Sequence, residues 1–467
     1  MEPATSHPLR RCCQALLLLV SFCLASGAAA YPEGPETAVE AGVLSADVLP
    51  LLSQLEQQGW LLHGQMTVVV QGHPRFRSPY QAAASLDPGA GARNTESLDL
   101  ILGRRLWQDA EIVLVPMVTR GFGLSNTLGA ASFPNGEAFR LGTREPYLSL
   151  SRAFLRQTIA LSSETEEITA NPLRFSGPVA RERVTITIGK MSVWDIFDDN
   201  RYAHDPRLEF LNWGMIAAGA FDYAADARGF TNGIVLEWEN GVWALRQGVF
   251  MVAARANGED LDQSVFKGYQ SITEIDRFWR LFDGRPGALR VLFGASSTLA
   301  PRWDEMTAAT RQSLDPPLRA QRHGSKPNFG MNAEQEFTDI IGGFIRFGWN
   351  NGLRRNWMFT EQDWSASAGI ALNGKAWQRE GDTIGLAFNI GGITKDHQRF
   401  LEAGGIGFIT GDGRLRYAPE KLVETYYDVK LAEGLNAAAN IQYLQNPAYN
   451  ADRGPAVILA LRLHAAF

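Results

Sequence analysis

The chain has 467 residues, and its 44 Lys and Arg residues stand against 50 Asp and Glu residues, giving a formal net charge of −6. This acidic balance argues against a nucleic-acid partner, because nucleic-acid binding needs a basic surface. All three cysteines lie within the first 23 residues, so the rest of the chain can form neither disulfides nor cysteine metal sites.

Residues 1–30 have the organisation of a secretory signal peptide. Arg10 and Arg11 form a basic start, residues 15–25 are apolar, and small residues at 28 and 30 precede a cleavage point before Tyr31. Cleavage there removes two basic residues and one acidic residue, which leaves a net charge of −7. After residue 30 no run of 18 apolar residues remains, so we expect no transmembrane helix, whereas membrane-spanning strands of about 9–11 residues stay open.

Residues 31–60 are predicted to form a periplasmic N-terminal segment. Tyr31–Gly42 is acidic and rich in Pro and Gly, and Leu44–Gln58 is predicted to be a short amphipathic helix that Gly59 closes. The apolar side of that helix carries Val48, Leu51, Leu52 and Leu55.

From residue 61 onwards the pattern is one of strands and turns. Apolar side chains occupy every second position in Val184–Ile188 and in Ile384–Ile390, and Trp243, Leu245, Val249 and Met251 share one face of a third segment. This period of two predicts strands with one apolar face. Such a face can point towards the core of a soluble sheet or towards lipid.

The C-terminus favours the membrane interpretation. Val457–Phe467 alternates to the last residue, an aromatic one, although the ends of soluble domains usually fray. A strand that ends in this way is typical of the signal by which bacterial outer-membrane barrels are recognised for insertion. We therefore expect Val457–Phe467 to be the last strand and to close against a first strand near Gln65–Gln71.

Aromatic residues and loops agree with a barrel. Tryptophans at the expected strand ends, which would form aromatic girdles, are Trp107, Trp238, Trp243, Trp349 and Trp377. Long polar loops are expected at Trp194–Arg207, Asn257–Gln263 and Met306–Phe329, and tight turns at Asn240-Gly241 and at Gly411–Gly413. Gly405–Gly411 resembles a dinucleotide-binding fingerprint only loosely and is predicted to be a hairpin. No repeat of fixed period is present, which argues against a propeller.

The chain also resembles the carbohydrate-selective porins over nearly all of its length after the leader. The segments that carry the resemblance, in chain order, are Phe133–Phe139, Gly189–Pro206, Asn212-Trp213, Asp222–Phe230, Glu424–Asp428, Gln442–Pro447, Arg462 and Phe467. The resemblance implies an all-β transmembrane antiparallel barrel of about 16 strands and passive uptake of sugars. The Leu44–Gly59 segment departs from the family because it lacks a Trp-Gly-Gly signature.

The segment Trp194–Arg207 is the leading candidate for a pore constriction, because its charges cannot sit in hydrocarbon. The residues expected to line the constriction are Trp194, Asp195, Asp198, Asp199, Asn200, Arg201 and Arg207. Carboxylates and a guanidinium would bind sugar hydroxyls there, and Trp194 would offer a stacking face. The alternatives are turn caps and ion pairs without a pore role, or a calcium site formed by the three aspartates, although EF-hand spacing is absent.

Polar residues on strand faces are candidates for the pore wall. Lys190, Glu237 and Arg246 are expected to face the lumen, where charges tune selectivity. No metal-ligand spacing, nucleophile elbow or phosphate-binding loop is present, and His204 beside Asp205 lacks a nucleophile motif. We therefore expect neither an enzyme nor a cofactor.

The function predicted from the sequence is a sugar-favouring outer-membrane porin that is exported through a cleaved signal peptide. The alternatives are a general diffusion porin, an outer-membrane hydrolase and a secreted glycan-binding β-sandwich. The expected partners are permeant sugars, outer-membrane lipid and the barrel assembly machinery. The sequence leaves both a monomer and a homo-oligomer open.

Overall fold

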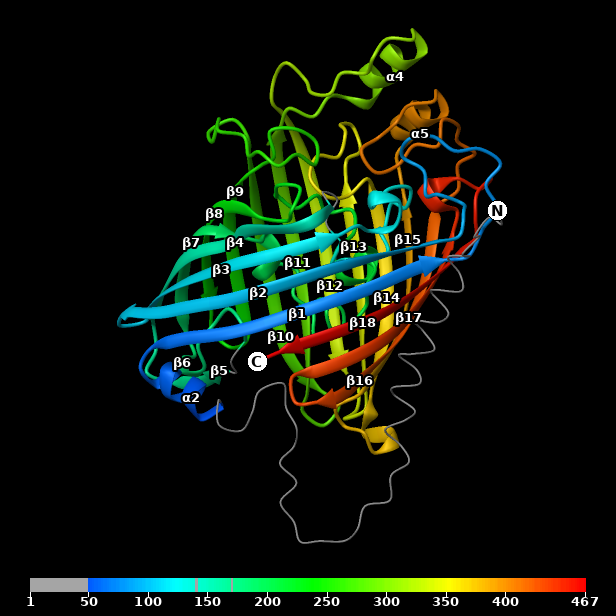
Figure 1. Cartoon of the computed structure of the whole chain (residues 1–467). Coiled ribbons are helices and arrows are strands. Elements are labelled where there is room, and N and C mark those ends of the chain that lie inside the picture. Colours follow the sequence, from blue (N-terminus) through cyan, green and yellow to red (C-terminus); the bar gives the residue numbers. More distant parts are fainter. Residues whose placement is uncertain (1–48, 139–141, 169–170) are drawn as a thin grey trace, which may run out of the picture.

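Sixteen strands close into one antiparallel barrel in the computed structural model, which describes residues 49–138, 142–168 and 171–467 (Figure 1). Each barrel strand pairs with its neighbours in the chain, except that β1 pairs with β18 to close the barrel and β4 pairs with β7, because β5 and β6 form a small separate sheet. The strands are β1 (Trp60–His73), β2 (Gly91–Trp107), β3 (Ala110–Gly121), β4 (Thr143–Ala160), β5 (Thr165–Ile168), β6 (Gly177–Ala180), β7 (Arg183–Met191), β8 (Thr231–Glu239), β9 (Trp243–Met251), β10 (Tyr269–Leu281), β11 (Arg285–Thr298), β12 (Gly324–Glu336), β13 (Ile341–Asn350), β14 (Trp364–Asn373), β15 (Thr383–Gly392), β16 (Glu420–Ala432), β17 (Leu435–Gln445) and β18 (Ala456–Ala466).

Helices are short and lie in the connections or before the barrel. They are α2 (Leu49–Gln57), α3 (Trp213–Ile216), α4 (Trp303–Arg311) and α5 (Lys395–Glu402), with 3-10 turns η1 (Leu124–Asn126), η2 (Val193–Asp195), η3 (Gly374–Trp377) and η4 (Pro447–Tyr449). None of the helices in the described ranges is long and apolar enough to cross a membrane. The predicted N-terminal helix corresponds to α2, which is present from Leu49. The start of its expected range and the whole signal peptide lie outside the described residues.

The barrel closes between its first and last strands, as the terminal alternation predicts. The register of β1 against β18 runs from Gln65 opposite Ala466 to Gly72 opposite Leu459. The backbone N–H of Phe467 donates to the carbonyl oxygen of Gly64 at 3.0 Å. A Cβ at Gly64 would lie 2.4 Å from the Phe467 ring, so the ring packs where only glycine leaves room.

Side chains alternate between an apolar outer face and the lumen. On β15, Leu386 and Phe388 are 48% and 43% exposed, whereas Ala387 between them is 3% exposed. On β9, Trp243 and Leu245 are likewise exposed on the outer face. This is the pattern of a barrel wall whose outer face meets an apolar solvent.

Connections of two kinds alternate along the chain. The rim that holds Phe467, which we call the short-turn rim, carries turns such as Asn240-Gly241 between β8 and β9, as predicted. The opposite, long-loop rim carries extended connections that include α4 and α5 (Figure 1). The one long connection at the short-turn rim is that between β4 and β7, which contains the β5–β6 hairpin.

Two local predictions were wrong. Met306–Phe329 is not one loop, because α4 extends to Arg311 and β12 begins at Gly324. Gly405–Gly411 and the Gly411–Gly413 turn lie in the long β15–β16 connection rather than in a hairpin. The physical reason is that the Glu361 carboxylate accepts the backbone N–H groups of residues 408–410, which a hairpin ladder would have paired across strands.

The largest apolar cluster lies inside the barrel. Residues 192–230, which connect β7 to β8, contribute buried side chains that include Phe197, Phe210, Trp213 and Phe221. These side chains pack with inward-facing residues of the wall, such as Phe344 on β13. The lumen is therefore largely filled by this connection, and cavities remain where its packing against the wall is incomplete.

Candidate functional site

The β7–β8 connection is fixed across the lumen by polar contacts with the wall. The Glu424 carboxylate of β16 accepts the backbone N–H groups of Leu211 at 2.7 Å and Asn212 at 3.0 Å. Arg462 of β18 donates to the carbonyl oxygens of Pro206 at 2.8 Å and Glu209 at 2.7 Å. The expectation that the Trp194–Arg207 segment folds inward agrees with these contacts.

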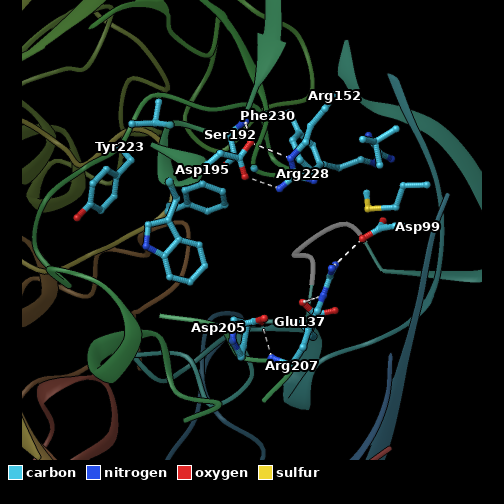
Figure 2. A pocket seen from close by; sticks show the side chains of 18 of the residues that line it. Asp99, Glu137, Arg152, Ser192, Asp195, Asp205, Arg207, Tyr223, Arg228 and Phe230 are labelled. Atoms are coloured by element: carbon cyan, nitrogen blue, oxygen red, sulfur yellow. Dashed lines mark hydrogen bonds and ion pairs between the residues drawn. The ribbon is translucent and has the colours of Figure 1, made fainter. Parts of the chain in front are cut away.

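A cavity of about 360 Å³ remains between this connection and the wall formed by β1 to β4 (Figure 2). Towards the long-loop rim it is lined by Thr127 and Asn257, and towards the short-turn rim by Asn171 and Leu173 of the β4–β7 connection. The cavity therefore extends along the barrel axis.

Two groups of paired charges lie on opposite sides of the cavity. Arg152 of β4 donates from Nε and Nη2 to the two carboxylate oxygens of Asp195, at 2.7 Å and 2.6 Å. Across the cavity, Arg207 contacts Asp99 of β2 at 2.8 Å and Glu137 at 3.0 Å (Figure 2). Guanidinium–carboxylate pairs of this kind hold both partners in fixed orientations.

Local backbone structure positions these groups. Asp195 ends the η2 turn and accepts the Ser192 backbone N–H at 2.9 Å, so its carboxylate both caps the turn and faces Arg152. Burial alone would lower the pKa of Arg207, but the carboxylates of Glu137 and Asp99 outweigh that effect and hold the pKa above its ordinary value. Arg207 therefore remains charged.

Aromatic rings form another part of the lining. The Trp194 ring lies 5.6 Å from that of Trp213, which in turn stacks on Phe133 at 5.3 Å between centroids. Phe230 lies under the Arg152 guanidinium, 5.2 Å from it. The cavity thus combines charged hydrogen-bonding groups with flat apolar faces.

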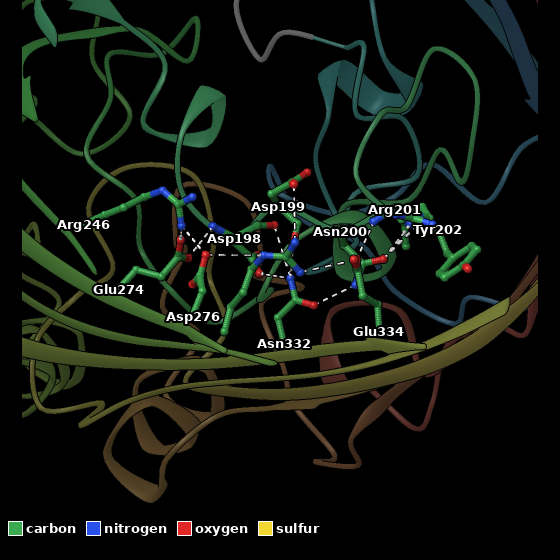
Figure 3. A network of polar contacts seen from close by, with 12 residues as sticks. Asp198, Asp199, Asn200, Arg201, Tyr202, Arg246, Glu274, Asp276, Asn332 and Glu334 are labelled. Carbon is green, nitrogen blue, oxygen red and sulfur yellow. Dashed lines mark hydrogen bonds and ion pairs between the residues drawn. The ribbon is translucent and has the colours of Figure 1, made fainter. Parts of the chain in front are cut away.

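The seven residues predicted for the constriction separate into three groups. Trp194, Asp195 and Arg207 line the cavity. Asp198 and Asn200 are instead buried against the opposite wall, where Asp198 pairs with Arg346 of β13 and Asn200 donates to Asn332 of β12 (Figure 3). Two of the predicted lining residues therefore fasten the connection to the wall.

Asp199 and Arg201 neither line the first cavity nor are buried against the opposite wall. The Asp199 side chain is 66% exposed and lies 3.5 Å from Arg290 of β11. Arg201 pairs with Glu336 at 3.1 Å and lines a second cavity of about 460 Å³ near the short-turn rim.

Of the predicted pore-wall residues, Glu237 and Arg246 face the lumen. Arg246 binds Glu237 at 3.0 Å, and also contacts Glu239, Glu274 and Asp276. Lys190 is placed differently, because it shares the outward parity of Ile188 at the end of β7 and pairs in register with Ala153 and Asn232. The register therefore does not support the lumenal position that the sequence predicted for Lys190.

Sequence reasoning missed Asp99, Glu137, Arg152 and Arg228, all of which line the cavity. A signal was present at Asp99, a single charge at an inward position between Leu98 and Leu100. A charge at such a position marks a lumenal polar site. Glu137 and Arg228, in loops, carry no comparable signal.

The aspartates of a candidate calcium site are held apart by their partners. Asp195, Asp198 and Asp199 pair with arginines of three different strands. Over the described ranges, no group of three or more His, Cys, Asp or Glu side chains has an arrangement that could hold a metal ion.

The comparisons with known proteins agree with this architecture. The model of the family described as "Carbohydrate-selective porin, OprB family" matches residues 91–467. The high-pH structure of Pseudomonas putida OprB superposes with a TM-score of 0.71 and 16% identity, covering 92% of this chain and all of that one. The low-pH structure of the same protein gives a TM-score of 0.52 at 12% identity, with the same coverage.

None of the curated proteins matches the sequence. The two solved structures show the fold, and the family model, which spans most of the chain, shows the family. The chain therefore belongs to the OprB family of carbohydrate-selective porins of the outer membrane.

Proposed function

We propose that neutral sugars diffuse passively through the cavity beside β1 to β4, and that the Arg152–Asp195 pair and the Arg207 cluster form its selective section. We define the Arg207 cluster as Arg207 with Asp99 and Glu137. The observation that carries the proposal is the pairing itself: facing charges of both signs are bound to each other at 2.6–3.0 Å. Such a surface offers hydrogen bonds but attracts neither cations nor anions strongly.

Sugar hydroxyls suit this lining because each can both donate and accept. A paired carboxylate keeps lone pairs for a hydroxyl donor, and a guanidinium keeps N–H groups for a hydroxyl acceptor. The apolar face of a sugar ring can lie against Trp194, and shared, weak contacts allow release.

The position of the passage can be tested with cysteines, because all native cysteines lie before residue 24. Gln65→Cys places a thiol in the cavity, and Asn436→Cys places one in the second cavity. We expect charged methanethiosulfonates to change single-channel conductance in Gln65→Cys and to leave Asn436→Cys unchanged. Modified Gln65→Cys channels with unchanged conductance would place the passage elsewhere.

Selectivity can be measured by liposome swelling with mono-, di- and oligosaccharides, using neutral amino acids as size-matched controls. We expect sugars to enter faster than amino acids of similar size, and Trp194→Ala to reduce that difference. Equal rates for both solute classes in the unmodified protein would identify a general diffusion porin instead.

We also propose that the leader is cleaved before Tyr31 and that assembly machinery inserts the barrel into lipid as a monomer or homo-oligomer. The apolar outer face of the strands supports insertion. N-terminal sequencing of protein purified from outer membranes tests cleavage, and an N-terminus at Met1 would contradict it. Mass measurement in mild detergent gives the oligomeric state.

A further inference from the structure

His204 is the one histidine that lines the cavity among the described residues. Its ring lies 4.5 Å from the Trp194 ring, and its Nδ1 atom is buried and has no hydrogen-bond partner in the part of the chain that the structure describes. The backbone N–H of His204 is fixed by the Glu209 carboxylate, which also accepts the N–H of Asp205 at 2.9 Å. The imidazole is therefore held in the passage by its own backbone and by an indole ring.

The other charged residues of the cavity lining balance each other. The carboxylates are Asp99, Glu137, Asp195 and Asp205, and the guanidiniums are Arg152, Arg156, Arg207 and Arg228. Among the described residues of the lining, four negative charges thus face four positive charges, and the charge on the imidazole decides their sum. Histidine is the side chain that ordinarily changes its charge between about pH 5 and 8.

We propose that His204 is a specificity-determining residue that sets the ion preference of the passage. With a neutral imidazole the lining is balanced and favours uncharged sugars. With an imidazolium the lining carries one excess positive charge, so carboxylated sugars such as aldonates and uronates enter as well. This inference rests on the proposed function of the cavity, because it requires that permeants pass His204.

Charged groups surround His204 on several elements. On its own connection, Asp199 is close enough for the charge of His204 to act on it, and Asp205 and Glu209 are joined to the His204 backbone. Asp99, Arg152, Asp195 and Arg207 line the same cavity. From the wall, Arg346 donates to the carbonyl oxygen of Ala203 and Arg462 to that of Pro206, and His464 lies near Asp205 and Arg207. His464 of β18 contacts Thr67 at 2.9 Å through Nδ1. Glu209 is the main competitor as a titrating group, because burial raises its pKa to about 8. Its side chain lines the second cavity rather than the passage.

The test is the reversal potential in a KCl gradient across planar bilayers at pH 8 and pH 5. We expect the chloride-to-potassium permeability ratio to rise by roughly three- to tenfold on acidification, the effect of one unit charge in a narrow pore. His204→Gln should abolish the rise, whereas Glu209→Gln should keep it. A rise that persists in His204→Gln, or one that is lost in Glu209→Gln, would overturn the proposal.

His204→Cys separates this proposal from that of the passage itself. A positively charged thiol reagent should raise chloride preference at pH 8, and a negatively charged one should lower it. If neither reagent alters current after confirmed labelling, the passage is misplaced and the proposed function fails with it. If both alter current while His204→Gln keeps the pH response, only the role of His204 is refuted. Faster swelling with gluconate at pH 5 than at pH 8, relative to glucose, then checks the substrate class.

Discussion

Replacement of Asp198 by alanine should release the β7–β8 connection without unfolding the barrel. The Asp198 side chain is 0% exposed, and its Oδ1 accepts from Arg346 Nε at 3.1 Å and from Asn332 Nδ2 at 2.8 Å. Its Oδ2 accepts from the Ala218 backbone N–H at 2.7 Å and from the Tyr223 hydroxyl at 2.8 Å. Alanine removes all four bonds and leaves Arg346, 3% exposed, without its carboxylate.

Removing one partner of a buried ion pair costs about 3–5 kcal/mol. None of the four bonds belongs to the strand ladders, so the cost falls on the docking of the connection rather than on the barrel. Each 1.4 kcal/mol is a factor of ten, and the undocked population should therefore rise by roughly a hundred- to a thousandfold. We expect larger and noisier single-channel conductance, weaker block by sugar, and unchanged heat-dependent mobility of the barrel on detergent gels.

Asp199→Ala is the matched control, one residue away. Its side chain is 66% exposed, and its ion pair with Arg290 spans 3.5 Å. Exposed pairs contribute about 0–1 kcal/mol, so this variant should keep the wild-type conductance and sugar block. If Asp198→Ala also keeps both, or if the two variants behave alike, Asp198 does not hold the connection in place and the reasoning is refuted.

Three further predictions concern the wall and the outer loops. Phe388→Arg should destabilise the barrel by about 2–4 kcal/mol, and Leu106→Arg near the short-turn rim by about 0–1 kcal/mol. Denaturant titration in detergent or lipid measures both free energies of unfolding. Equal losses of stability in the two variants would contradict a dependence on depth in the bilayer. Deletion of Phe467 removes its bonds with Gly64 and should lower the fraction of folded barrel in outer membranes, so normal assembly would count against the closure. Burial alone would raise the pKa of Asp262, but the hydrogen bonds from His323 at 2.7 Å and from the Ser264 backbone N–H at 2.8 Å together outweigh burial and lower the pKa. These contacts should therefore stabilise the loops of the long-loop rim at pH values above the ordinary carboxyl pKa, and the stabilisation should be lost as the pH falls through the lowered pKa. Faster cleavage of these loops by an acid-active protease at low pH would show the loss, and an unchanged cleavage rate would contradict it.

The sequence was sufficient for the barrel because the relevant signals are local. Alternation in segments such as Ile384–Ile390 depends only on neighbouring residues, and the same is true of the terminal pattern up to Phe467. At Lys190 the alternation itself indicates the outer face, because Lys190 continues the outward parity of Ile188. A lysine at a strand end can extend its charged group beyond the apolar zone, so its charge alone does not indicate the lumen.

The site was less predictable because its geometry depends on partners far along the chain. Composition alone indicates that the charges of Trp194–Arg207 cannot face hydrocarbon, but it does not say which of them meets the passage. Asp195 and Asp198 are three residues apart, yet one pairs with Arg152 of β4 and the other with Arg346 of β13. Which arginine each aspartate meets is determined by the path of the connection across the lumen, and no local sequence pattern encodes that path.

Two lumenal carboxylates that anchor connections and two that line the cavity accept hydrogen bonds from different kinds of donor. Glu424 and Asp222 accept backbone N–H groups of inward-folded connections in the packed part of the lumen. Asp99 and Glu137 instead accept from the Arg207 side chain at the cavity. A side-chain substitution other than proline leaves the backbone N–H donor in place, whereas substitution of an arginine removes its guanidinium. Substitutions in the Arg207 cluster can therefore alter what the passage admits while the connections that shape it stay anchored.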